Sequence, residues 1–174
     1  MNRIYLDAPS LVYRAFFAWP TTITDPHGNP VNAVRGFMEM VTRLELDRRP
    51  DEIVATFDED WRPAFRVDAY RGYKSERPED PPELPPQFDV LAEVLDAAGI
   101  VRAEAQGREA DDVLTTLRRR KPSPERAEIV TGDRDLLCLV HDPDVRLLYP
   151  VKGVSEMREF DESEVWEAYG VAPR

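Results

Sequence analysis

Three short apolar runs in this chain each end in an aspartate. The aspartates are Asp7, Asp58 and Asp133, and they follow residues 4–6, 53–57 and 128–132. If these runs are strands of a parallel sheet, their carboxyl ends lie along one edge, which is where open α/β folds hold their chemistry. Residues far apart in the sequence are therefore expected to meet as a group of carboxylates.

Four more acids extend this group. Glu109, Asp111 and Asp112 open a helical pattern, and Asp135 follows Asp133 by two residues. Two unit charges about 4 Å apart repel by roughly 4 kcal/mol at an effective dielectric of 20. Seven converging carboxylates would therefore need protons or cations to neutralise them.

Each acid also has a simpler explanation, because aspartates cap turns after strands and acids favour the first turn of a helix. The joint pattern favours metal binding. Oxygen ligands without histidine or cysteine suit Mg²⁺ or Mn²⁺ rather than zinc. Two such ions can activate water and stabilise both oxygens of a phosphodiester displacement, which points to phosphate chemistry of the two-metal type. No second aspartate stands two residues after Asp7, as an aspartyl phosphatase would need, and no Gly-rich phosphate loop appears.

The elements that must position these acids alternate along the chain. Apolar runs predict strands at residues 3–7, 53–57, 100–105, 128–132 and 145–149. Helical spacing predicts helices at residues 11–18, 32–44, 88–98, 109–120, 134–140 and 162–169. We expect side-chain caps from Ser10 and Asn32, a C-cap at Gly99, a capping box from Asp161 and Glu164, and a turn at residues 151–154. The alternation predicts an α/β fold with a mainly parallel central sheet flanked by helices.

Residues 61–87 follow neither pattern. The segment holds six prolines and many charges, and its aromatic and cationic residues alternate. Prolines exclude a continuous helix through this segment. We expect it to be exposed and mobile, with residues 75–86 poorly ordered when no partner is bound.

Composition sets further bounds. The 174 residues suffice for one domain, and the net charge of −11 argues against a strongly basic nucleic-acid binder. The single cysteine, Cys138, excludes an intramolecular disulfide, fits a reducing cytoplasm, and is expected to be a small buried group. No apolar run reaches membrane-spanning length, so no membrane partner is expected.

Several motifs together resemble the 5′→3′ exonuclease domain of bacterial DNA polymerase I and its stand-alone flap-endonuclease relatives, within the PIN-like superfamily. The order and spacing of these motifs hold over essentially the whole chain. They are residues 6–17, residues 28–37, Phe57-Asp58, Phe65-Arg66, Tyr73-Lys74-Ser75-Glu76-Arg77, Glu109-Ala110-Asp111-Asp112 and residues 131–137.

The resemblance implies a Rossmann-like three-layer fold and a metal-dependent 5′ nuclease that leaves a 5′-phosphate and a 3′-hydroxyl. It makes Lys74 and Arg77 catalytic residues on a helical arch at about residues 61–87, and adds Arg14, Arg66 and Tyr73 to the DNA-binding residues. Tyr73 could stack on a base, since stacking is tolerant of sequence. The metal ligands it implies are Asp7, Asp58, Glu109, Asp111, Asp112, Asp133 and Asp135. The expected partner is DNA with 5′ ends or flaps, without a small-molecule cofactor, and with a polymerase domain on the same or another chain as a possible companion.

Two departures from the family pattern leave alternatives open. Ala8-Pro9 stands where the family has Gly-His, and the chain ends about where a helix-turn-helix-like DNA-binding region begins in the family. We therefore expect residues 1–174 to be the catalytic domain, that region to be absent, and the second metal site to be incomplete. A truncated, catalytically weak nucleic-acid-binding fragment and a PIN-type ribonuclease remain alternatives, although the long proline-rich arch argues against the ribonuclease.

Overall fold

A six-stranded sheet with the strand order β3-β2-β1-β4-β5-β6 forms the centre of the protein in a computed structural model that describes residues 1–120, 126–152 and 156–173. Neighbouring strands are parallel except for β6, which runs antiparallel to β5. The strands are β1 Asn2–Asp7, β2 Glu52–Thr56, β3 Val101–Ala103, β4 Arg126–Val130, β5 Val145–Lys152 and β6 Glu156–Phe160. The predicted fold class is confirmed.

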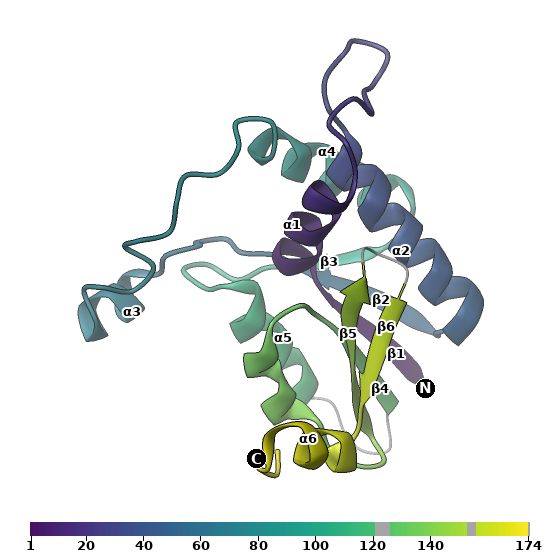
Figure 1. Cartoon of the computed structure of the whole chain (residues 1–174), viewed down its shortest axis with the longest axis vertical. Coiled ribbons are helices and arrows are strands. Elements are labelled where there is room, and N and C mark those ends of the chain that lie inside the picture. The colour runs from purple at the N-terminus through teal and green to yellow at the C-terminus, as the bar shows by residue number, and fades with distance from the viewer. Residues whose placement is uncertain (121–125, 153–155, 174) are drawn as a thin grey trace.

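Helices cover both faces of this sheet (Figure 1). They are α1 Ala8–Ala18, α2 Asn32–Arg48, α3 Ala64–Ala69, α4 Pro85–Ala97, α5 Ala110–Arg120, the 3₁₀ helix η1 Arg134–Leu139 and α6 Glu162–Tyr169. Alternate side chains of each strand point to opposite faces. Ile4 and Leu6 pack with α1, α2 and α4, whereas Tyr5 packs with α5, η1 and α6. The result is three layers around two apolar cores.

The strand order places a topological switch point between β1 and β4. From β1 the chain adds β2 and β3 on one side of the sheet, and β4 and β5 follow on the other. In open α/β sheets the crevice at such a point, outside the carboxyl ends of the strands, is where ligands bind. Asp7 ends β1, and Thr131 to Asp133 follow β4, so both flank this crevice.

Prolines shift the start of two helices from the predicted positions. Helix α1 begins at Ala8 instead of Leu11, and α4 begins at Pro85 instead of Phe88. In both helices a proline occupies the first turn, where its fixed φ suits the helix and its missing N–H costs nothing. The expectation of irregular structure up to residue 87 is therefore wrong at its end.

Two predicted side-chain caps are also wrong. Ser10 lies inside α1, and its Oγ accepts a hydrogen bond from the Gly132 N–H at 2.9 Å. Asn32 is the first residue of α2 rather than its cap, and it is fully buried. Its side-chain amide donates to the carbonyls of Phe16 and Trp19, both at 2.9 Å. Asn32 thus holds the end of α1 against the start of α2.

The observed strand boundaries differ from the predicted ones both inside the sheet and at its edges. Strand β4 ends at Val130, two residues early, and β3 covers only three residues. Val151 and Lys152 belong to β5 instead of a turn, while Gly153 and Val154 lie outside the described residues. Strand β6 was not predicted, because three of its five residues are charged and an edge strand needs little apolar character.

Two other local predictions hold in full or in part. Gly99 has φ +71° just after α4, as predicted for a helix C-terminus. At the start of α6 Asp161 accepts a hydrogen bond from the Glu164 N–H at 2.8 Å, but the Glu164 carboxylate accepts from Arg158 at 2.6 Å, so within the described residues only the Asp161 half of the predicted capping box is made. Cys138, in contrast, is exposed, so its predicted burial is wrong. Within the described ranges, every helix is too short or too polar to cross a lipid bilayer.

The segment between β2 and α4 leaves the body of the protein and carries α3 outside it (Figure 1). Helix α3 has no buried residue, so the apolar core does not hold it in place. Leu84, in contrast, is fully buried and fixes the far end of the segment. The predicted mobility of residues 75–86 in the absence of DNA remains a prediction.

Candidate metal and nucleic-acid site

Three carboxylates gather at the start of α5. Glu109, Asp111 and Asp112 each offer an oxygen, and these oxygens lie within 4.8 Å of one another. We call them the outer carboxylates; within residues 1–120, 126–152 and 156–173 they form the one acidic group of this kind. Glu109 is only 4% exposed. The positive end of the α5 dipole favours negative charge at this position.

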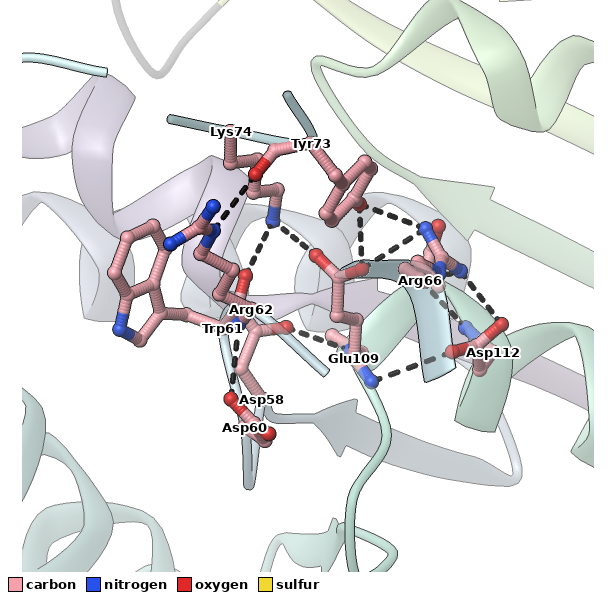
Figure 2. A network of polar contacts seen from close by, with 11 residues as sticks. Asp58, Asp60, Trp61, Arg62, Arg66, Tyr73, Lys74, Glu109 and Asp112 are labelled. Atoms are coloured by element: carbon pink, nitrogen blue, oxygen red, sulfur yellow. Dashed lines mark hydrogen bonds and ion pairs between the residues drawn. The ribbon is translucent and has the colours of Figure 1, made fainter. Parts of the chain in front are cut away.

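Side chains from the segment around α3 cover the outer carboxylates (Figure 2). The Arg66 guanidinium contacts Glu109 at 2.9 Å, Asp112 at 2.7 Å and Asp111 at 3.5 Å. Lys74 Nζ forms an ion pair with Glu109, and the Tyr73 hydroxyl donates to Glu109 at 2.6 Å. Burial raises the pKa of Asp111, and the positive charge of Arg66 opposes this shift. The protein itself thus supplies cations to this group.

A second acidic group lies at the switch point, and we call Asp7 and Asp133 the inner carboxylates. Asp7 is 6% exposed and accepts a hydrogen bond from Thr131 Oγ1 at 2.6 Å. The same Thr131 oxygen accepts from the Asp133 N–H at 2.9 Å. Burial raises the pKa of Asp7 to about 7; the charges of Asp58 and Asp133 add to the shift, and the Thr131 bond opposes it.

Asp58 links the two groups electrostatically. Its carboxylate accepts a hydrogen bond from the Ala110 N–H, the first residue of α5, at 2.7 Å. Burial raises the pKa of Asp58, and the charges of Glu109 and Asp111 add to this effect. Because the charge of Asp58 also raises the pKa of Asp7, the carboxylates form one continuous acidic edge.

The remaining predicted site residues lie farther out. Asp135 is exposed, and its backbone N–H donates to Asp133 Oδ1 at 2.9 Å. Arg77 is exposed, and its charge acts on Tyr13 of α1, whose hydroxyl donates to Asp80. The structure therefore brings Arg66, Tyr73 and Lys74 onto the outer carboxylates and places Arg77 nearer to α1.

Arg14 lies on the other side of the acidic edge. Its guanidinium sits 5.9 Å from the centre of the Tyr149 ring. It also lines an open cavity of about 570 Å³, together with Ser10, Tyr13, Phe17, Ala18 and Gly132. Arg14 and Arg66 thus place one positive charge on each side of the carboxylates.

Thr131 is a site residue that the sequence analysis did not select. It is fully buried, and its hydroxyl joins Asp7 to the backbone of Asp133. A signal was present, because a threonine in an otherwise apolar run needs a hydrogen-bond partner once buried. Only the parallel pairing of β1 with β4 shows that this partner is Asp7.

The chemistry of the outer carboxylates fits a divalent cation. Their donors are all oxygens, they converge within reach of one ion, and Glu109 is almost completely buried. Hard cations such as Mg²⁺ take ligands of this kind. The contacts of Arg66 and Lys74 show that the group attracts positive charge.

Fold and acidic edge together define a PIN-like α/β domain. Two solved structures share the fold over 98% of this chain, at low sequence identity. A bacteriophage T5 protein co-crystallised with metal ions has a TM-score of 0.72 at 17% identity, with 62% of its chain covered. A bacteriophage T5 flap endonuclease in a complex with DNA and metal ions has a TM-score of 0.65 at 16% identity, with 61% covered.

Sequence comparison defines the family more closely. The family described as the 5′-3′ exonuclease, N-terminal resolvase-like domain, matches residues 2–170, and the chain belongs to it. A 5′-3′ exonuclease of Streptomyces coelicolor is 47% identical over 95% of this chain and 58% of its own length. DNA polymerase I of Mycobacterium bovis is 44% identical over 97% of this chain and 19% of its own length. The chain thus spans little more than half of the shorter relative.

Proposed function

We propose that this chain is the nuclease domain of a divalent-metal-dependent 5′ nuclease. Its substrate is DNA with a 5′ end or flap, and its products carry a 5′-phosphate and a 3′-hydroxyl. One observation carries the proposal: three converging carboxylates lie directly beneath Arg66 and Lys74, two cations able to bind phosphate. The family and the names of its relatives support the same activity.

Mg²⁺ or Mn²⁺ is the cofactor we propose. Glu109, Asp111 and Asp112 would hold one ion, with Asp58 beside them. Asp7, Asp133 and Asp135 would contribute to a second position at the switch point. When bound, such ions lower the pKa of water and stabilise charge on the phosphate oxygens. This ligand assignment gives a reason for the burial of Asp7, whose charge no ion pair balances within the described residues.

The cations of the arch would exchange one set of partners for another. Without DNA, Arg66 and Lys74 neutralise the outer carboxylates. With an ion in place, the same side chains are free to bind the scissile phosphate, Lys74 as a point charge and Arg66 through its planar fork. Arg14 and Arg77 would contact the DNA backbone, and Tyr73 offers a ring for base stacking.

The same proposal covers the organisation of the chain. Residues 1–174 would form the catalytic domain, with residues 61–87 as its arch. Relatives that match this chain are longer, and one of them is a DNA polymerase I. A duplex-binding region or a polymerase domain, on the same or another chain, would supply the additional grip on DNA that a domain of net charge −11 needs.

A labelled 5′-flap duplex tests this function. Glu109→Gln should lower cleavage in Mg²⁺ or Mn²⁺ about 100-fold, because removal of a metal ligand weakens metal binding and transition-state stabilisation. Glu104→Gln is the matched control, since Glu104 is exposed and lies outside the acidic edge. Its activity should equal that of the unmodified chain.

The assay should be run on the chain alone and on the chain joined to the part of the Streptomyces relative outside the match. Equal cleavage by the unmodified chain and Glu109→Gln would refute the proposal. Flap binding without cleavage at high Mn²⁺, in both forms, would identify a non-catalytic binding fragment. Preference for single-stranded RNA would identify a ribonuclease.

A further inference from the structure

Arg62 ties together the two ends of the α3 segment (Figure 2). Its Nε donates to the Tyr73 carbonyl at 2.7 Å, and its terminal nitrogen donates to the Arg71 carbonyl at 3.1 Å. The Arg62 N–H in turn donates to Asp60 Oδ1 at 2.9 Å. One side chain thus joins residues 60–62, which lead out to α3, to residues 71–74, which lead back from it.

Residues 71–74 carry the groups that reach the acidic edge. Tyr73 donates its hydroxyl to Glu109, and Lys74 pairs with Glu109 while its Nζ also donates to the Trp61 carbonyl at 2.9 Å. Lys74 has φ +51°, a left-handed conformation that a residue with a Cβ adopts at a cost and that its surroundings must maintain. Since α3 buries no residue, the core does not provide this support.

We propose that Arg62 is a positioning residue of the nuclease. It acts on the backbone of Tyr73 and so places Tyr73 and Lys74 over the carboxylates, without contacting the carboxylates itself. The guanidinium suits this role because its fork donates to two carbonyls at once, whereas a lysine has no such fork. This inference rests on the proposed nuclease function and adds a residue outside the motifs that carry it.

Arg71 offers a matched control within the same segment. It is exposed, and no ion pair of its side chain occurs in the described part of the chain. Its contribution to the network is its backbone carbonyl, which Arg71→Ala retains. Arg62→Ala and Arg71→Ala therefore remove the same charge from the same segment. Only Arg62→Ala also removes the link between residues 60–62 and residues 71–74.

Single-turnover flap cleavage at saturating protein separates positioning from DNA binding. Arg62→Ala should lower the cleavage rate on the order of 10-fold, because small misplacements of catalytic groups are costly, and should change the Kd for the flap in Ca²⁺ less than about 3-fold. Arg71→Ala should leave the cleavage rate unchanged and raise the Kd for the flap. Arg62→Lys should recover part of the rate. Equal effects of Arg62→Ala and Arg71→Ala, or an Arg62→Ala effect confined to Kd, would overturn the proposal.

Limited trypsin digestion of the DNA-free protein gives a second measurement that does not depend on activity. Cleavage after Lys74 and Arg77 should accelerate in Arg62→Ala at an unchanged melting temperature, and it should not accelerate in Arg71→Ala. If the unmodified chain cuts no flap DNA, either alone or joined to the part of the Streptomyces relative, the nuclease function fails while the digestion still tests Arg62. Unchanged digestion of Arg62→Ala would remove the proposed link.

Discussion

The inner and outer carboxylates differ in how their negative charge is stabilised. Asp7 is almost fully buried and is stabilised by the neutral hydroxyl of Thr131. The outer carboxylates receive the formal charges of Arg66 and Lys74. Within the described residues no ion pair balances the charge of Asp7, whereas Arg66 and Lys74 balance the charge of the outer carboxylates. The difference predicts opposite effects of mutations on the two sides of one acidic edge.

The position of each group in the fold accounts for this difference. Asp7 ends β1, a strand enclosed by β2, β4 and two layers of helices, and the side chain that reaches it there is the short Thr131 after β4. The outer carboxylates begin a helix that faces the projecting α3 segment. Long side chains from that segment reach them without being buried in the core.

The largest expected effect is a gain of stability on removing the inner charge. The folded-state pKa of Asp7 is about 7 against an ordinary 3.8, so the metal-free protein loses stability as pH rises from about 4 to about 7. Asp7→Asn should therefore raise the free energy of unfolding by about 4 kcal/mol at pH 8 and by less than half of that at pH 5. Urea unfolding in EDTA measures both.

The control for Asp7→Asn is Asp68→Asn, which changes the same charge at an exposed position. Asp68→Asn should give no pH-dependent gain in the free energy of unfolding. If Asp7 helps to hold the ion, added Mg²⁺ should narrow the difference in the free energy of unfolding between Asp7→Asn and the unmodified chain. A pH-independent gain in Asp7→Asn would contradict the role of charge at this position.

The next effect has the opposite sign. Arg66→Met should lower the free energy of unfolding in EDTA at pH 8 by about 2 kcal/mol, because the outer carboxylates lose charge-assisted hydrogen bonds. Mg²⁺ should stabilise Arg66→Met more than the unmodified chain, since no guanidinium competes with the ion. Calorimetric titration with Mg²⁺ measures this directly, and weaker binding by Arg66→Met would argue against the competition.

The smallest effect sharpens the description of the inner group. Thr131→Val keeps the side-chain shape and removes two hydrogen bonds, the one donated to Asp7 and the one accepted from the Asp133 N–H, which should together cost about 1.5 kcal/mol at pH 8. The bond from Thr131 lowers the pKa of Asp7, so removing it should raise that pKa. In the same urea series, the pH range over which the free energy of unfolding falls should therefore extend to higher pH. Thr56→Val, which removes a bond to the Leu6 carbonyl, should show no such movement.

Local sequence patterns predicted most of the scaffold because they report local physics. The apolar runs before Asp7 and Asp58 end close to the observed strands, and Asp161 caps α6 as predicted. The predictions are wrong where a residue distant in the sequence determines the local structure. Ser10 looks like a cap but bonds to Gly132 beyond β4, and the charged strand β6 exists because β5 offers an unpaired edge.

The acidic site divides in the same way. The sequence by itself determined which carboxylates follow strands or open a helix, because residue type and periodicity are local properties. Only the tertiary structure decided that three of them meet under Arg66, that Asp7 is buried against Thr131, and that Arg62 holds the backbone of Tyr73. These contacts join residues brought together by strand pairing and by the path of the α3 segment, and no spacing in the sequence encodes them.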